Sequence, residues 1–432
     1  MATARTGRGR VAVVAGCRTP FAKAGTAYRD LTALDLARTC VRELVERTEI
    51  DPGGVDIVVM GQVVPSVKAP NLAREVVLSA GLPPSVPAHT VNSACASANQ
   101  AIVDVASEIL QGNAEVGIAG GAESLSDVPI LHSRNMARAL VGASRAKSMG
   151  DRVRAFSSVR LRDLAPDAPA IAEPSTGLTM GQSAEKMARE NGITREAQDL
   201  IAFQSHQKAA DATDDGRLGR ELVPVLPPPH YEPAIVADNL LRRDTTMEAL
   251  AALPPVFDRR YGTVTAGNSS PLTDGAAAVV LMSAARAARE GMEPLAFIRS
   301  WAFAAVEPGG QLLMGPAIAI PRALDRAHLT LADIGIIEMH EAFAAQVLSN
   351  IQALESDTWA GEKLGRPQAV GKVDRSRLNL SGGSIAIGHP FGATGARVTT
   401  TLANEMARRG ARYGLLSVCA QGGLGFAMVL ER

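Results

Sequence analysis

Short apolar runs alternate with amphipathic segments along most of the chain. VAVVAG at 11–16 and VDIVVMG at 55–61 have the length and composition of buried strands. Between them, residues 31–48 carry apolar side chains at helical spacing. Continuous apolar strands separated by helices are typical of a sheet that is covered on both faces. We therefore predict an α/β fold in which helices and a largely buried sheet form layers.

Two regions far apart in the sequence share the same predicted order of elements, a helix that ends in glycine and then a strand. Residues 93–112 have a helical period, with Ser93 as the candidate N-cap and a glycine at the end, and a strand is predicted at 115–124. Residues 388–410 have the same period and also end in a glycine, and a strand is predicted at 413–420. The repetition favours two similar halves.

The amino-acid composition changes between the two halves, where charged residues and proline clusters become frequent. We interpret residues 123–252 as an inserted loop domain that contains a helix near 193–212. The N-terminal half then spans 1–122 and is completed by about 253–283, and the C-terminal half spans 284–432.

A basic segment lies inside this insertion. Residues 132–162 hold eight Lys and Arg residues against one acidic residue, Asp151. Such a run is either a solvated helical face or a surface for an acidic partner, a membrane or a phosphate group.

The overall composition argues against several classes of protein. Lys plus Arg and Asp plus Glu both number 44, and aromatic residues make up only 3%, so nothing favours nucleic-acid binding. No apolar run reaches the ~18–20 residues that cross a bilayer. The Arg-rich start lacks a signal-cleavage pattern, and organelle targeting is its alternative interpretation. Four widely separated cysteines indicate a reduced, cytoplasmic protein.

Two residues with nucleophile and base chemistry begin the repeated helices. Cys95, in VNSACASANQ, lies at the predicted start of helix 93–112, where the helix N-terminus lowers a thiol pKa. His389 lies in NLSGGSIAIGHPFGATG, where five glycines indicate a backbone that passes close to another group. Its imidazole can take a thiol proton or polarise a carbonyl. A buried structural cysteine and a structural turn are the alternatives.

Two further segments offer reactive side chains. Cys419 ends the strand predicted at 413–420 and can act as an acid or base, or simply fill the core. His340 and Glu341 lie where a strand hands over to a helix, a common ligand position in α/β sheets. Zinc ligands usually come in close pairs such as CxxC, so the wide spacing of these cysteines and histidines argues against a metal site.

Nine segments resemble the motifs of the thiolase family in order and spacing, and together they cover essentially the whole chain. They are RTPF (18–21), GQVV (61–64), VNSACAS (91–97), GGAESLS (120–126), MGQSAE (180–185), TAGNSSPLTDGAAA (265–278), HEAF (340–343), GGSIAIGHPFGATGAR (382–397) and CAQGGLG (419–425). The resemblance implies an α/β fold of five αβαβα layers, built from two similar mixed-sheet halves with an inserted loop domain. It also implies a homodimer or homotetramer.

The resemblance implies a role for each reactive residue. Cys95 would attack the 3-keto carbonyl of a 3-ketoacyl-CoA, and His389 would activate it. Cys419 would protonate the acetyl-CoA enolate and then deprotonate the incoming coenzyme A. The backbone N–H groups of Cys95 and Gln421 would stabilise oxyanions, with Gln421 standing where many thiolases have glycine. Coenzyme A and acyl-CoA are then substrates, and no separate cofactor or metal is expected.

One residue that differs from the usual thiolase motif indicates which kind of thiolase the chain resembles. His340 stands where most thiolases have an asparagine, and HEAF, the long insertion and the CAQGGLG ending resemble β-subunits of fatty-acid-oxidation complexes. This favours degradative thiolysis in β-oxidation, with biosynthetic acetoacetyl-CoA synthesis and a non-catalytic scaffold as alternatives. It implies an enoyl-CoA hydratase/3-hydroxyacyl-CoA dehydrogenase subunit or a membrane as partner. Met180, Ser270 and Phe343 become candidate substrate contacts.

Overall fold

The computed structural model describes residues 9–165 and 172–432 and divides into two compact units. The larger unit comprises everything up to Asp127 together with Glu173–Arg432, and the smaller unit comprises Val128–Ala172. Residues 173–252 of the predicted insertion therefore belong to the larger unit. Among the described residues, every helix is too short or too polar to cross a bilayer.

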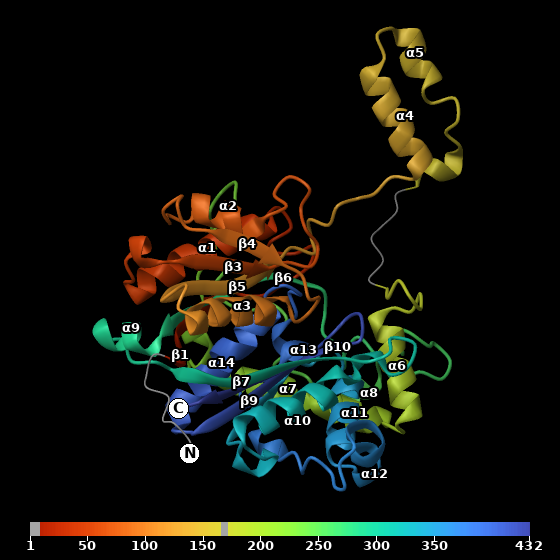
Figure 1. The fold of residues 1–432 in the computed structure, drawn as a ribbon. Helices are drawn as coiled ribbons and strands as arrows, with labels where there is room; N and C mark the ends of the chain where they lie inside the picture. The colour runs from red at the N-terminus through yellow and green to blue at the C-terminus, as the bar shows by residue number, and fades with distance from the viewer. Residues whose placement is uncertain (1–8, 166–171) are drawn as a thin grey trace. The chain divides into compact units, whose positions relative to one another are not determined.

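A single mixed sheet runs through the larger unit (Figure 1). Its N-terminal strands are β1 (Val11–Arg18), β2 (Ala22–Lys23), β3 (Ile57–Gly61), β4 (Ala88–Val91), β5 (Val116–Glu123) and β6 (Thr273–Ser283). Its C-terminal strands are β7 (Ala296–Ala305), β8 (Ile336–Met339), β9 (Tyr413–Ala420) and β10 (Leu424–Glu431). The order is β4-β3-β5-β6-β1-β7-β10-β9-β8, with β2 paired to β6.

The strand order repeats from one half of the sheet to the other. In the N-terminal half, β3 is parallel to β5, and β6 runs antiparallel to both β5 and β1. In the C-terminal half, β8 is parallel to β9, and β10 runs antiparallel to both β9 and β7. A parallel bridge between Leu378 and Ile337 of β8 occupies the place that β4 has beside β3. The prediction of two similar mixed-sheet halves is confirmed.

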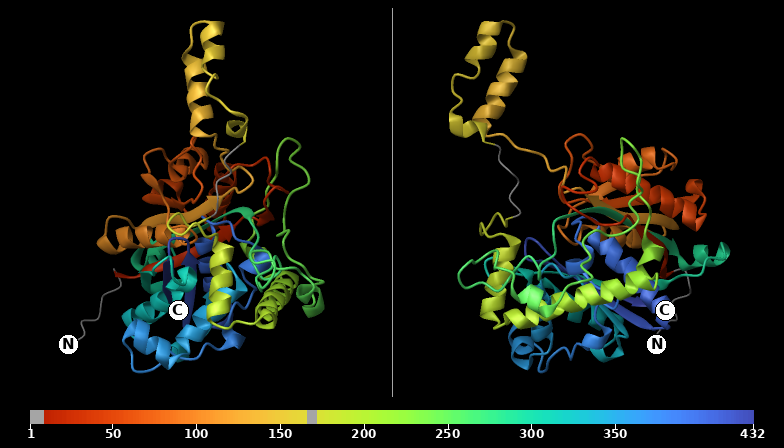
Figure 2. Two further views of the ribbon diagram at one scale, coloured as in Figure 1. Left: turned by 90° about the vertical axis from the view of Figure 1, so that its right-hand side faces the viewer. Right: turned by 180° about the vertical axis from the view of Figure 1, so that it is seen from behind.

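Helices cover the two sheet halves in three layers (Figures 1 and 2). The N-terminal outer layer is α1 (Ala33–Thr48) and α2 (Leu72–Ser79), the central layer is α3 (Ser97–Gln111) and α14 (Thr394–Arg409), and the C-terminal outer layer is α10 (Gly315–Ala327) and α11 (Ala344–Leu354). Alternate strand residues face opposite layers. Phe426 and Met428 of β10 pack toward α3 and α14, while Ala427 and Val429 pack toward the outer layer. This is the predicted αβαβα arrangement.

The remaining helices of the larger unit cover its ends and loops. They are α6 (Met180–Glu190), α7 (Arg195–Asp214), α8 (Met247–Ala251), α9 (Ala284–Arg289), α12 (Asp357–Trp359) and α13 (Ser384–Ile387). The predicted helix at 193–212 is α7. The helices predicted at 93–112 and 388–410 begin later than expected, at Ser97 and Thr394. In both cases the residues before the helix form the loops that carry reactive side chains.

The smaller unit is a pair of helices, α4 (Arg134–Arg145) and α5 (Met149–Arg154), which pack against each other (Figure 2). Serine side chains cap both: Ser133 accepts from the Met136 N–H, and Ser148 accepts from the Asp151 N–H. The basic segment predicted at 132–162 lies within this unit.

Candidate active site

Cys95 lies in a tight turn directly before α3. The preceding residue, Ala94, has a φ of +49°, a left-handed conformation that favours glycine. Two side chains hold it there. The Asn92 side-chain oxygen accepts from the Ala94 N–H at 3.0 Å, and the Ser97 hydroxyl donates to the Ala94 carbonyl at 2.6 Å. The reactive cysteine is therefore carried on a strained, hydrogen-bonded backbone.

The expected N-cap and the expected thiol ionisation are both wrong. The N-cap of α3 is Ala96 rather than Ser93, so Cys95 lies before the helix instead of in its first turn. Although the residue as a whole is only half-buried, desolvation of its sulfur raises the pKa of the Cys95 thiol to about 12. The backbone N–H groups of Gln421 and of Cys95 itself oppose this rise. The resting group is a neutral thiol that two N–H donors face.

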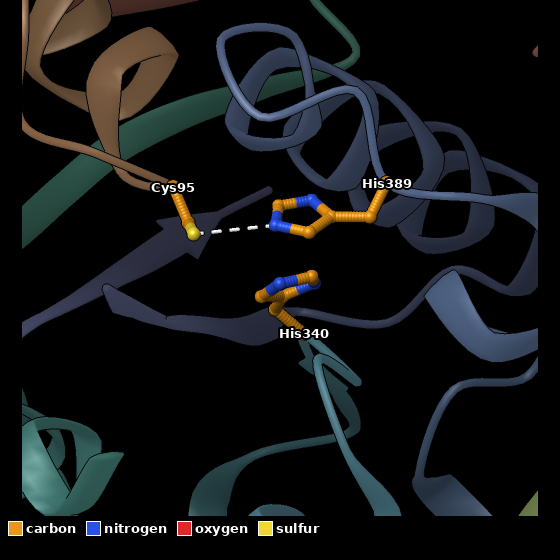
Figure 3. Close-up of side chains that lie close together, drawn as sticks. All are labelled: Cys95, His340 and His389. Carbon is orange, nitrogen blue, oxygen red and sulfur yellow. Dashed lines mark hydrogen bonds between the residues drawn. The ribbon is translucent and has the colours of Figure 1, made fainter. Parts of the chain in front are cut away.

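His389 reaches the Cys95 sulfur from the loop between α13 and α14. Its Nε2 lies 3.2 Å from Cys95 Sγ. The dashed line in Figure 3 marks this hydrogen bond. Its Nδ1 lies 2.6 Å from the Thr394 hydroxyl, which itself donates to the Pro390 carbonyl. Since the hydroxyl has one hydrogen, it must accept from an Nδ1–H, and this leaves Nε2 unprotonated. The geometry assigns His389 as the acceptor of the Cys95 thiol proton.

Burial also keeps the imidazole neutral. Desolvation, and next the nearby Arg397 guanidinium, lower the pKa of His389 to about 3. With the thiol pKa raised and the imidazole pKa lowered, the pair is uncharged near neutral pH. Cys95 therefore becomes a nucleophile only as its proton passes to His389, and a preformed ion pair is not the resting state.

Glu123 ties the two halves of the sheet together beside this pair. It ends β5, and its carboxylate accepts from the N–H groups of Val63, Val64 and Gly392, each at 3.0 Å. Gly392 belongs to the same loop as His389. A Cβ at Gly392 would lie 2.6 Å from the carbonyl oxygen of Gly61, so only glycine permits this approach.

His340 follows β8 and lies against the same site. Its ring centroid is 4.1 Å from that of His389, and its Nδ1 is 2.8 Å from the Ser384 hydroxyl. Figure 3 shows the His340 ring beside the His389 ring. Desolvation, followed by the His389 and Arg397 charges, lowers the pKa of His340 well below its usual value. Both histidines are thus neutral hydrogen-bonding groups.

Cys419 lies near the end of β9 and is buried. Desolvation and next the proximity of Cys95 raise the pKa of the Cys419 thiol. The backbone N–H two residues further on, that of Gln421, faces the Cys95 sulfur. The fold thus brings together four residues that the sequence singled out, namely Cys95, His340, His389 and Cys419.

The fold also changes the argument against a metal. Cys95, His340 and His389 each place a ligand atom within 4.8 Å of the others, so their wide spacing in the sequence does not separate them in space. A closed structural zinc site needs four ligands, and this group supplies three. The 3.2 Å contact between sulfur and nitrogen is accounted for by a thiol–imidazole hydrogen bond.

The candidate substrate contacts lie around an apolar cluster and a cavity. The cavity has a volume of about 450 Å³, and Ser270 is in its wall. Phe343 packs edge-on against another wall residue, Phe257, with ring centroids 6.1 Å apart. Met180 and Phe343 pack against the buried cluster that contains Cys419. The predicted contacts are therefore grouped between the cavity and the reactive cysteines.

Some side chains that hold the site escape prediction from the sequence. Thr394, Ser384 and Glu123 all contact reactive residues or their loops. Each is a short polar or acidic residue inside a glycine-rich motif, GATG, GGS or GGAES. Polar residues among glycines are the signal that could have identified them, because a close-packed loop leaves few hydrogen-bonding partners for buried groups.

Comparison with known proteins places the chain in a family. The model of the thiolase N-terminal domain matches residues 11–285, and that of the thiolase C-terminal domain matches residues 292–432. The chain belongs to the thiolase family.

Curated relatives and solved structures agree over nearly the full length. The chain is 51% identical over 422 residues to the 3-ketoacyl-CoA thiolases of Cronobacter sakazakii and Yersinia enterocolitica, covering 98% of this chain and 97% of each relative. Human mitochondrial 3-ketoacyl-CoA thiolase in complex with CoA superposes with a TM-score of 0.81 at 34% identity, covering 98% of each chain. Bacillus anthracis acetyl-CoA acetyltransferase superposes with a TM-score of 0.83 at 33% identity, covering 98% of this chain and 99% of that one.

Proposed function

We propose that this chain is a 3-ketoacyl-CoA thiolase, an acetyl-CoA acyltransferase of fatty acid β-oxidation. It cleaves a 3-ketoacyl-CoA with coenzyme A to give acetyl-CoA and an acyl-CoA shortened by two carbons. The observation that carries the proposal is the Cys95–His389 pair, 3.2 Å apart where the two sheet halves meet, with Cys419 beside it. The 51% identity to 3-ketoacyl-CoA thiolases supports the degradative direction.

The first half-reaction forms an acyl-enzyme. The Cys95 sulfur attacks the 3-keto carbon while His389 Nε2 takes the thiol proton. The bond between carbons 2 and 3 then breaks, and its electron pair becomes the enolate of acetyl-CoA. Cys419 enters as a protonated thiol, since its pKa is raised, and it gives its proton to the enolate carbon.

The second half-reaction releases the shortened product. The Cys419 thiolate takes the proton of the incoming coenzyme A thiol, and the resulting thiolate attacks the acyl carbon on Cys95. Cys95 leaves as a thiolate and recovers its proton from His389. Both cysteines return to their starting protonation states, so the cycle balances.

Negative charge develops on substrate oxygens in both half-reactions. The backbone N–H groups of Cys95 and Gln421 face the sulfur and would donate to the oxyanion of the acyl-thioester intermediate. His340, as a buried neutral imidazole, would donate to the thioester oxygen of the enolate. Backbone donation explains how Gln421 can stand where many thiolases have glycine.

The cavity that contains Ser270 suits the coenzyme A portion of the substrate. Lys23 and Arg242 supply positive charge to its wall, and Leu250, Leu253 and Phe257 supply apolar surface. Phosphate groups and the apolar pantetheine arm need this combination. The substrates would enter here and reach Cys95 past Phe343 and Met180.

The smaller unit would meet a partner. Its basic residues coexist with exposed apolar side chains, among them Met149 at 72% and Val153 at 70% exposure. An exposed apolar surface rimmed by like charges is typical of a docking site. We propose as partner the enoyl-CoA hydratase/3-hydroxyacyl-CoA dehydrogenase subunit of a β-oxidation complex, with an anionic membrane as the second candidate. We also propose that this chain forms a homodimer or homotetramer and is located in the cytoplasm.

Thiolysis of 3-ketoacyl-CoA from C4 to C16 tests the function directly. The enzyme should cleave chains longer than C4, show an acyl adduct on Cys95 by mass spectrometry, and lose both in Cys95→Ala. The assay is run after dialysis against EDTA, which should leave the rate unchanged. Activity confined to C4 would instead assign the biosynthetic alternative, an acetoacetyl-CoA thiolase. An adduct on Cys419 alone would reverse the roles of the two cysteines.

A further inference from the structure

Ser384 and Arg397 form a buried chain that ends on His340. The Ser384 hydroxyl lies 2.8 Å from His340 Nδ1, and the Arg397 Nη2 donates to the same hydroxyl at 2.8 Å. His340 and Arg397 are each 1% exposed and Ser384 is 0% exposed, so water does not compete for these bonds. The function proposed above uses neither Ser384 nor Arg397.

The direction of each bond follows from the number of hydrogens. A guanidinium only donates, so the Ser384 oxygen is an acceptor toward Arg397. The hydroxyl has one hydrogen, and among the described residues the only acceptor in reach is His340 Nδ1. Ser384 therefore donates to Nδ1. A neutral imidazole that accepts at Nδ1 carries its hydrogen on Nε2.

The other end of the imidazole supports this assignment. His340 Nε2 is buried and has no hydrogen-bonding partner among residues 9–165 and 172–432. A buried donor without a partner costs free energy and is retained where a ligand supplies the acceptor. Desolvation lowers the pKa of His340, which keeps the ring in this single-hydrogen form.

One turn of helix organises both histidines. The hydroxyl of Thr394, the first residue of α14, accepts a hydrogen bond from the Nδ1–H of His389. This leaves the Nε2 of His389 as an acceptor. Arg397, three residues further along the same turn, donates to the Ser384 hydroxyl, and the hydroxyl donates to His340 Nδ1, which leaves the Nε2 of His340 as a donor. The two imidazoles have their centroids 4.1 Å apart and require opposite tautomers. The same helix turn therefore gives His389 an acceptor at its Nδ1 and, through Ser384, gives His340 a donor at its Nδ1.

We propose that Ser384 and Arg397 are positioning residues that fix His340 as its Nε2–H tautomer and make it a hydrogen-bond donor to a substrate oxyanion. The inference rests on the proposed thiolysis for the identity of that oxyanion. The tautomer itself does not depend on it. In a neutral imidazole with the other tautomer, a nitrogen lone pair would face the developing negative charge and oppose it.

The first experiment reads the tautomer without using activity. Protein labelled with ¹⁵N-histidine gives separate signals for the two nitrogens of a neutral ring, and comparison with His340→Asn identifies those of His340. The wild type should carry hydrogen on Nε2, and Ser384→Ala should lose this preference. A wild-type ring with hydrogen on Nδ1 would overturn the proposal. The wild type alone decides this point if a variant does not fold.

The second experiment is a double-mutant cycle in thiolysis. Ser384→Ala, which removes one oxygen and adds no atoms, should lower kcat about 10–100-fold with little change in KM, the size of effect that follows removal of the hydrogen-bonding partner of a metal-ligating histidine. Ser384→Cys, with a weak donor of similar size, should recover part of the loss. In a His340→Asn background, Ser384→Ala should have little effect, because no imidazole remains to be positioned.

The outcomes separate this inference from the proposed function. If wild-type enzyme cleaves no 3-ketoacyl-CoA, the proposed function fails while the nitrogen signals still test the tautomer. If the enzyme is active but Ser384→Ala matches wild type, the positioning role is wrong. An equal loss of kcat in the His340→Asn background would make Ser384 a structural residue only.

Discussion

At the scale of single residues, the site depends on uncharged reactive groups. Burial raises the pKa of Cys95 and lowers that of His389, and each shift opposes the ion pair that an isolated helix-start cysteine suggests. The sequence identifies both residues, because Cys95 lies among small residues at the start of a predicted helix and His389 lies in a glycine-rich loop. It does not reveal their ionisation, which depends on what packs over them.

The neutral thiol makes a prediction about alkylation. Because the pKa of Cys95 is raised to about 12, the thiolate fraction should increase tenfold with each pH unit below that value. The rate of Cys95 alkylation by iodoacetamide should rise about tenfold per pH unit between pH 7 and 10 without a plateau. Peptide mass spectrometry assigns the adduct, with Cys95→Ser as control. A plateau below pH 8 would indicate a resting thiolate–imidazolium pair instead.

Cys419 should be needed for only part of the chemistry. In Cys419→Ala, transfer of an acyl group between Cys95 and a simple acyl-CoA should persist at a reduced rate, because this exchange involves no enolate and water can take the proton of the coenzyme A thiol in place of Cys419. Carbon–carbon cleavage should fall by about 10²–10⁴-fold, the usual contribution of a general acid or base. Radiolabelled exchange and thiolysis rates measure the two activities on the same preparation. Equal loss of both activities would count against an acid/base role of Cys419 that is specific to the enolate step.

At the scale of elements, most strand and helix bounds were predictable to within two residues, but the starts of the two helices beside the site were not. The strand predicted at 413–420 matches β9, and that at 115–124 differs from β5 by one residue at each end. The helices predicted from 93 and 388 begin at Ser97 and Thr394. The apolar pattern continues through the preceding loops because the loop before α14 is largely buried and the loop before α3 is half-buried. Only long-range contacts, such as those of Glu123, make these residues loops.

The left-handed residue in the turn before α3 should lower the stability of the protein while it holds Cys95 in place. Ala94→Gly removes a left-handed penalty of about 1–2 kcal/mol but gives back about 0.5–1 kcal/mol as unfolded-chain entropy. We expect a stability equal to or above that of wild type and a kcat several-fold lower, because Cys95 is held less firmly. Urea unfolding and thiolysis kinetics measure the two effects.

A matched control removes the same methyl group from a regular helix. Ala210→Gly, inside α7, should destabilise the protein by about 1 kcal/mol and leave kcat unchanged. If Ala94→Gly destabilises the protein as much as Ala210→Gly, the φ of +49° at Ala94 carries no strain.

At the scale of the whole molecule, the sequence predicts two similar halves but does not predict which of their residues meet. Matching helices and strands in two regions indicate two halves, and the strand order confirms them. The meeting of Cys95 with His389, 294 positions apart, cannot follow from periodicity. It arises because α3 and α14 occupy equivalent places in the two halves and pack in one central layer. Equivalent loops before the two helices then face each other.

The smaller unit gives the prediction that distinguishes a solvated face from a docking surface. Arg145, Lys147, Arg152 and Arg154 are exposed on α4, α5 and the turn between them. The exposed apolar residues Val141, Met149 and Val153 lie on the same two helices. Exposed apolar side chains that are grouped with basic residues on two short helices favour a docking surface over a solvated face.

Changing the four basic residues to alanine should abolish capture of the hydratase/dehydrogenase subunit and leave thiolysis intact. The control changes four exposed basic residues of the larger unit, Arg29, Lys68, Arg322 and Lys372, and should bind normally. Wild-type binding should weaken as salt rises past 0.15 M, where the Debye length falls below about 8 Å. A second variant, with Val141, Met149 and Val153 changed to serine, should bind weakly at every salt concentration. Co-sedimentation with anionic vesicles tests the membrane in parallel, and equal binding by wild type and both variants would make the segment a solvated face.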